Sequence, residues 1–126
     1  MARKESRIQQ MCVGWCRMQY PQIANLLFSV PNGGSRILRE AVTLKKEGVV
    51  AGVSDLILLF PSMGYHGLCI EMKTDEKTSR QSKSQKEWQQ LVESAGYKYI
   101  ICRNFDDFES EIKIYLESYL KSYFDL

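Results

Sequence analysis

The sequence lacks several features that mark large classes of proteins. Its longest unbroken aliphatic and aromatic run, residues 56–60, is far too short to cross a bilayer. The first ten residues are charged and polar, so the sequence predicts no secretory signal peptide and we expect a cytoplasmic protein. No GxxxxGK[ST] segment is present, which argues against a nucleotide-driven motor and against a nucleotide cofactor.

Histidine is almost absent and cysteine is not paired by spacing. The single His66 excludes any mechanism that needs two histidines, including the common zinc sites. The four cysteines form no CxxC pair, and in a reducing compartment we expect free thiols. Cys12 and Cys16 lie one helical turn apart and could in principle bind a metal, although small buried hydrophobic residues are the simpler interpretation.

An excess of charge of one sign is also missing. Seventeen basic and fifteen acidic residues give a formal net charge of +2, which excludes a histone-like tail. A local basic patch for nucleic acid remains compatible with this balance. At 126 residues the chain fits a single domain, 1–126, with enough length to bury a core without disulfides.

The pattern of apolar and turn residues predicts eight elements in the order α-β-α-β-β-α-β-α. The predicted helices cover 3–18, 35–47, 82–95 and a segment capped by Asn104; the predicted strands cover 26–30, 55–60, 68–73 and 97–102. Strands joined by the short segment 62–67 should be antiparallel, whereas the strand–helix–strand step from 68 to 102 should be parallel. The fold class is therefore α/β, a mixed sheet flanked by helices.

Helical spacing predicts which residues of three helices face the core. The predicted stripes are Ile8, Met11, Cys12, Trp15 and Met18; Trp88, Leu91, Val92 and Ala95; and Phe108, Ile112, Tyr115 and Tyr119. The last helix carries more aromatic surface than one sheet face needs. Its aromatic residues indicate either core packing with scattered exposed tyrosines or a dimer interface, and the residues concerned are Tyr115, Tyr119, Tyr123 and Phe124.

Charged residues converge at one end of the predicted sheet. Side chains alternate along a strand, so Glu71 and Lys73 share one face, and a hairpin would bring Asp55 beside them. Two carboxylates suit Mg²⁺, with the Met72 carbonyl as a neutral ligand. Such a metal would polarise a phosphodiester oxygen, and Lys73 would position or deprotonate water or stabilise charge on the phosphate. The alternative is a Glu71–Lys73 pair on a half-exposed sheet face, with Asp55 as a turn residue.

The ordered residues around this site resemble a known family. In chain order they are Glu5 with Gln9, Pro31-Asn32-Gly33-Gly34, Gly52-Val53-Ser54-Asp55, Glu71-Met72-Lys73, Gln85, Trp88, Leu91 and Gly96. The set resembles the PD-(D/E)XK nuclease superfamily and, more closely, a stand-alone VRR-NUC (virus-type replication-repair nuclease) domain. The resemblance covers residues 5 to about 102. One position departs from it, because the family usually has proline where this chain has Ser54.

The resemblance implies a restriction-endonuclease-like fold and phosphodiester hydrolysis that depends on Mg²⁺ or Mn²⁺. It implies that Asp55 and Glu71 bind the metal and that Lys73 is the catalytic lysine. Gln85 would orient substrate or water beside Lys73, and Glu5 would reach the metal or its water from the first helix.

Polar and basic residues near the matched positions are candidates for DNA contacts. They are Asn32, Ser35, Arg36, Arg39, Lys77, Arg80, Lys83 and Lys86. A solvated loop and helix start is the alternative interpretation of the same residues. Small stand-alone relatives resemble dimeric enzymes that cut branched DNA, and a two-fold dimer would present two sites to a four-way (Holliday) junction. We therefore expect a homodimer that cuts such junctions; a flap-type or single-strand nuclease and a non-catalytic or partner-dependent DNA-binding subunit are the alternatives.

Overall fold

The computed structural model describes residues 3–31, 38–75 and 80–124, without the side chains of 38, 39 and 118–124. Its elements are α1 (Arg3–Gln19), the 3₁₀ helix η1 (Pro21–Leu26), β1 (Leu27–Ser29), α2 (Leu38–Lys46), β2 (Leu56–Leu58), β3 (Leu68–Met72), α3 (Lys83–Ser94), β4 (Lys98–Cys102) and α4 (Phe105–Phe124). Apart from η1, which the sequence pattern did not predict, the order is the expected one.

The four strands form one mixed sheet in the order β1-β2-β3-β4. The β1–β2 and β2–β3 pairs are antiparallel and the β3–β4 pair is parallel. The β2–β3 connection turns at Met63 and Gly64, which both have positive φ, as a tight two-residue hairpin turn requires. The predicted hairpin and the predicted parallel step are both confirmed.

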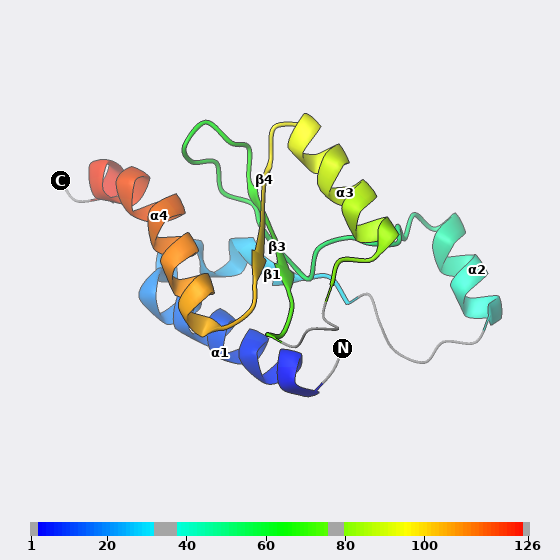
Figure 1. Cartoon of the computed structure of the whole chain (residues 1–126). Helices are drawn as coiled ribbons and strands as arrows, with labels where there is room; N and C mark the ends of the chain where they lie inside the picture. The colour runs from blue at the N-terminus through cyan, green and yellow to red at the C-terminus, as the bar shows by residue number, and fades with distance from the viewer. Residues whose placement is uncertain (1–2, 32–37, 76–79, 125–126) are drawn as a thin grey trace.

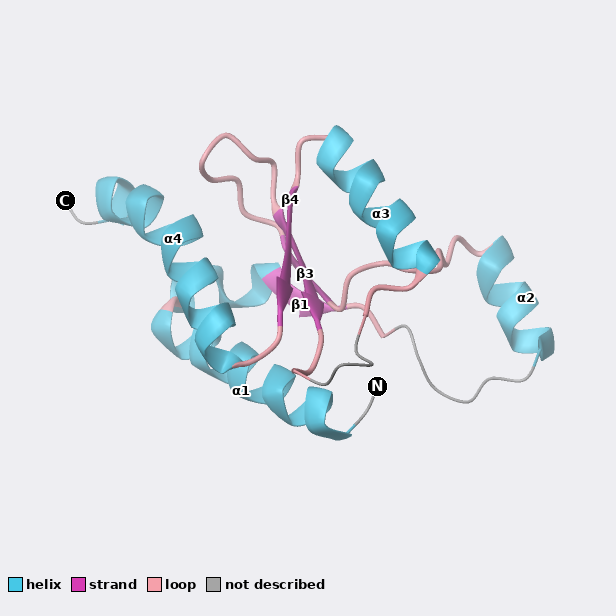
Figure 2. Ribbon diagram, viewed as in Figure 1, coloured by secondary structure: helices cyan, strands magenta, loops and turns pink. Residues whose placement is uncertain are grey.

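Helices cover both faces of the sheet. In Figures 1 and 2, α1 and α4 lie on one side of the strands and α3 lies on the other. Leu68, Ile70 and Met72 of β3 belong to the core cluster that includes residues of α1 and α4. Cys69 belongs to a smaller cluster with Val92 and Tyr99. The alternation predicted for β3 is therefore correct, and Glu71 lies on the face that α3 covers.

The predicted helix faces are only partly right. Met11 and Met18 of α1 and Leu91 of α3 are exposed, and Ala95 at the end of α3 is exposed as well. The buried face of α1 is narrower than predicted because the large Trp15 ring occupies much of it. This ring meets the rings of Tyr20, Phe105 and Phe108 edge to face. Helical spacing alone did not show how much surface one large aromatic ring would cover.

The four cysteines are free and buried. Burial raises the pKa of Cys12 to about 12 and that of Cys16 to about 11, so both remain neutral thiols. Among the residues that the structure describes, neither belongs to a group of three or more ligands that could hold a metal. The interpretation of these cysteines as small buried hydrophobic residues is confirmed.

The last helix starts at the predicted cap and is anchored in the core. Asn104 Oδ1 accepts a hydrogen bond from the Asp107 backbone N–H at 2.8 Å. Tyr115 is fully buried and donates to the Phe60 carbonyl at 2.7 Å, so the interpretation of Tyr115 as an interface residue is wrong. The side chains of Tyr119, Tyr123 and Phe124 lie outside the described residues. None of the described helices is both long and apolar enough to cross a membrane.

Candidate active site

Asp55 lies directly across the sheet from Glu71. The last β2–β3 pair is Leu56 with Ile70, so one further step places Asp55 opposite Glu71. Asp55 Oδ2 accepts a hydrogen bond from the Met72 backbone N–H at 2.7 Å. This bond fixes the Asp55 carboxylate beside the end of β3. The prediction that a hairpin brings Asp55 next to Glu71 is confirmed.

Glu71 is a buried carboxylate held by two side chains. It is 1% exposed; Gln85 Nε2 donates to Oε1 at 2.9 Å and the Tyr99 hydroxyl donates to Oε2 at 3.3 Å. Burial, together with the hydrogen bond to Asp55 and its negative charge, raises the pKa of Glu71 to about 9, while the charge of Lys73 and the Tyr99 hydroxyl act to lower it. A half-exposed surface pair of Glu71 and Lys73 does not fit this burial.

The oxygen atoms around Asp55 suit a hard divalent cation. The Lys73 N–H donates to the Cys102 carbonyl of β4, whereas the Met72 N–H points to Asp55. Because a strand residue directs its N–H and C=O to the same side, the Met72 carbonyl also faces Asp55. Two carboxylates brought together, Glu71 buried and Asp55 partly buried, attract a cation, and Mg²⁺ typically takes one or two carboxylates with other oxygen ligands.

The described part of the chain offers two carboxylates at this point and not three. No group of three or more His, Cys, Asp or Glu side chains with metal-binding geometry occurs among those residues. Glu5 lies half-buried in the first turn of α1 and does not join Asp55 and Glu71 as a third ligand. Its contact with a metal-bound water stays a prediction of the resemblance.

Gln85 is oriented by the first turn of α3. Its backbone N–H donates to Ser82 Oγ at 3.2 Å, and its side-chain Oε1 accepts from the Ser82 N–H at 2.8 Å, forming a capping box. With Oε1 engaged in this way, Nε2 is directed at Glu71. The structure therefore connects Gln85 to Glu71, while its predicted role beside Lys73 stays a prediction.

Tyr99 and Gln81 complete this arrangement, and neither was a predicted site residue. Gln81 Nε2 lies 3.1 Å from the Tyr99 hydroxyl and 2.9 Å from Gln89 Oε1. Burial raises the pKa of Tyr99 above its usual range, so its hydroxyl stays protonated and can donate. Strand periodicity was the sequence feature that could have identified Tyr99. It pairs with Cys69 in the parallel register and so lies on the sheet face that Glu71 shares.

The segment before Asp55 is fastened to α3 at two points. Ser54, where the family usually has proline, is fully buried, and its Oγ accepts a hydrogen bond from Trp88 Nε1 at 2.9 Å. Gly52 has a φ of +85°, and a Cβ there would lie 2.3 Å from the Ser84 carbonyl oxygen. The close backbone approach and the buried hydrogen bond together fix the position of Asp55, the residue immediately before β2.

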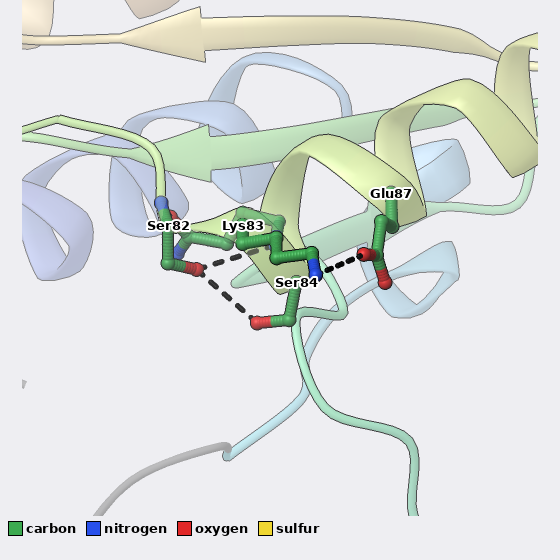
Figure 3. A network of polar contacts seen from close by, with 5 residues as sticks. Ser82, Lys83, Ser84 and Glu87 are labelled. Carbon is green, nitrogen blue, oxygen red and sulfur yellow. Dashed lines mark hydrogen bonds and ion pairs between the residues drawn. The ribbon is translucent and has the colours of Figure 1, made fainter.

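Three of the predicted DNA-contacting residues are described in full, and all are exposed: Arg80, Lys83 and Lys86. Figure 3 shows Lys83 at the start of α3, where its Nζ lies 3.9 Å from Glu87 Oε1. Both side chains of this pair are largely solvated, so the pair contributes little and leaves Lys83 available to a phosphate. Asn32, Ser35, Arg36, Lys77 and the side chain of Arg39 lie outside the described residues.

The geometry agrees with what comparison with known proteins found. Residues 1–106 match the model of the VRR-NUC domain. The chain belongs to the VRR-NUC domain family. A solved structure described as a VRR_NUC domain protein is 28% identical and aligns with a TM-score of 0.78, covering 93% of this chain and 91% of its own. Comparison with curated proteins gave no match. The VRR-NUC family is a family of nuclease domains, and the mixed sheet flanked by helices agrees with the solved relative.

Proposed function

We propose that this VRR-NUC domain is a Mg²⁺-dependent DNA endonuclease that hydrolyses phosphodiester bonds. The observation that carries the proposal is the position of Asp55 beside buried Glu71, with Lys73 directly after β3 and its charge acting on Glu71. This is the arrangement on which the family resemblance rests. Nuclease membership and site geometry therefore support the same chemistry.

The oxygens of Asp55, Glu71 and the Met72 carbonyl would hold Mg²⁺ or Mn²⁺. When bound, such an ion supplies Lewis-acid polarisation of a phosphate oxygen and a lower pKa for a coordinated water. Lys73 positions the attacking water and balances the negative charge that develops on the phosphate. Gln85 and Tyr99 keep Glu71 in place through their hydrogen bonds to its two oxygens.

Exposed basic residues beside the site supply contacts to the DNA backbone in this proposal. Arg80, Lys83 and Lys86 follow β3 in the chain and extend along the start of α3. Contacts of this kind position a strand without reading its sequence. Selectivity must then come from the shape of the DNA, and a two-fold homodimer would present two sites to the symmetric strands of a four-way junction.

A nicking assay on four DNA shapes tests the proposal. The purified protein is incubated with a four-way junction, a flap, a linear duplex and single strands of shared sequence, each with Mg²⁺, Mn²⁺ or EDTA. The proposal predicts symmetric nicks in the junction with either metal and none with EDTA. Cutting of flaps or single strands instead would support the assignment of the site but overturn the proposal of a homodimer that cuts four-way junctions. Junction binding with no cutting would favour a binding module or a partner-dependent subunit.

A further inference from the structure

A hollow of about 630 Å³ opens beside the candidate active site. Asp55 and Gln85 contribute to its lining. One wall is formed by α2, with Val42 and Leu44, and by the segment 49–53; the start of α3, with Ser82 and Ser84, forms the other. The hollow is therefore continuous with the site proposed to hold the scissile phosphate.

The walls of this hollow are apolar and open to solvent. Val42, Val49 and Val50 are each about half exposed. In Figure 1, α2 stands away from the sheet, beyond the start of α3. No described side chain of α2 is buried, and a helix of nine residues is marginal in water without a packing partner. An occupant with an apolar surface would complete the packing of α2.

The position of the hollow limits what that occupant can be. An occupant that fills it reaches Asp55 and Gln85, which also line it, and so lies next to the phosphodiester proposed to bind at the site. Phosphate and sugar are polar, whereas the face of a nucleobase is the part of a nucleotide that suits apolar side chains. Ser84, whose hydroxyl lies 3.2 Å from the capping Ser82 Oγ, adds a polar group for a base edge, and Lys45 offers a cation to a neighbouring phosphate.

A base in an intact duplex is stacked and paired, and it cannot enter a side pocket without leaving the helix. We infer that the hollow between α2 and α3 holds an unstacked nucleobase adjacent to the scissile phosphate. The substrate is then DNA with an unpaired or readily unpaired nucleotide at the cut, such as the exchange point of a branched molecule or a bulge. This inference rests on the proposed nuclease function and specifies its substrate.

The first test removes the base and leaves the backbone. Three matched DNA substrates carry, next to the cut, an unpaired nucleotide, an unpaired abasic site or a fully paired nucleotide. We expect kcat/KM to fall about tenfold when the unpaired base is replaced by the abasic site, and to be lowest for the paired substrate. Equal cleavage of all three would leave the nuclease intact and overturn the base pocket.

The second test changes the pocket. Val50→Asp and Val42→Asp put a charge on the two parts of its apolar wall, and Met18→Asp puts one on a largely exposed position of α1. The wall variants should lose the tenfold preference for the base-bearing substrate, while Met18→Asp keeps it. If a wall variant instead keeps that preference and converts a dimer to a monomer in sedimentation, the hollow is a subunit interface and the inference fails.

A binding measurement separates this inference from the proposed chemistry. The unpaired position carries 2-aminopurine, whose fluorescence depends on stacking, and Lys73→Ala is used so that the DNA is not cut. A change in fluorescence on binding that Val50→Asp abolishes would support the pocket, even if no DNA is cleaved by the wild-type protein. A fluorescence that binding leaves unchanged would overturn it.

Discussion

Gln85 Nε2 lies 2.9 Å from Glu71 Oε1, which joins the first turn of α3 to the buried carboxylate of the candidate site. The same side chain accepts from the Ser82 N–H and so closes the capping box of that helix. One amide therefore stabilises the start of α3 and orients a proposed metal ligand. Its two roles can be separated by measuring stability and metal dependence together.

Gln85→Ala should affect both properties. Loss of the cap contact should lower the free energy of unfolding by about 1 kcal/mol. Loss of the Glu71 contact should raise the Mg²⁺ concentration needed for half-maximal cleavage about tenfold. Gln90→Ala, on the exposed face of the same helix, is the control and should change neither. An unchanged Mg²⁺ dependence in Gln85→Ala would show that Gln85 does not position Glu71.

Asp55→Asn should remove the stabilisation that the protein gains from Mg²⁺. The asparagine Oδ1 can still accept from the Met72 N–H, so the fold should be retained, while the negative charge of a proposed metal ligand is lost. Thermal unfolding with Mg²⁺ and in EDTA measures the effect. Mg²⁺ at about a hundred times its Kd should stabilise the wild type by about 2.7 kcal/mol and leave the variant unaffected. If Mg²⁺ stabilised the variant as much as it stabilises the wild type, Asp55 would not be a Mg²⁺ ligand.

Ser54→Ala should destabilise the protein because Trp88 donates a hydrogen bond to the Ser54 hydroxyl. Trp88 Nε1 would lose its acceptor in a partly buried position, at a cost of about 1–3 kcal/mol. In a Trp88→Phe background the same change should cost much less, because the donor is already gone. Chemical denaturation of the four proteins of this cycle measures the coupling. Additive effects would indicate that the hydrogen bond does not contribute to stability.

Gly52→Ala and Gly14→Ala should have opposite effects. At Gly52 the positive φ and the nearby Ser84 carbonyl leave no room for a Cβ, so alanine should destabilise by more than about 1 kcal/mol and lower cleavage by displacing Asp55. Gly14 lies within α1 with nothing close to an added Cβ, so alanine should stabilise by up to about 1 kcal/mol. Melting temperatures compare the two, and a stable, fully active Gly52→Ala would contradict the close packing.

The hairpin and the pairing of Asp55 with Glu71 could be predicted because both follow from local rules. The period of two in a strand assigned the faces of residues 68–73, and the short connection required an antiparallel partner. The contacts of Tyr99 and Trp88 with the site could not be predicted from these local rules. Glu71 is 28 residues from Tyr99 and Ser54 is 34 from Trp88, so tertiary packing alone decides these pairs.

Exposure was harder to predict than element type. The sequence pattern does not show that the described side chains of α2, at residues 40–46, are not buried, since its apolar residues also suit a core-facing helix. Ser54 could be recognised as a departure from the family proline, but not as the acceptor for an indole. Its hydrogen bond offers another way of fixing the backbone before Asp55, where a proline would restrict φ.

The most direct test of the proposed active site is the rate of Mg²⁺-dependent phosphodiester cleavage by Lys73→Ala, measured beside the wild type and Lys113→Ala. Lys113 lies on α4, where its Nζ is 3.6 Å from Glu109 Oε2, and has no place in the proposed site. Circular dichroism and DNA binding would be measured on the same preparations. We expect Lys73→Ala to fold and bind DNA without cleaving it, and Lys113→Ala to cleave at the wild-type rate. Full cleavage by Lys73→Ala would contradict the assignment of the site.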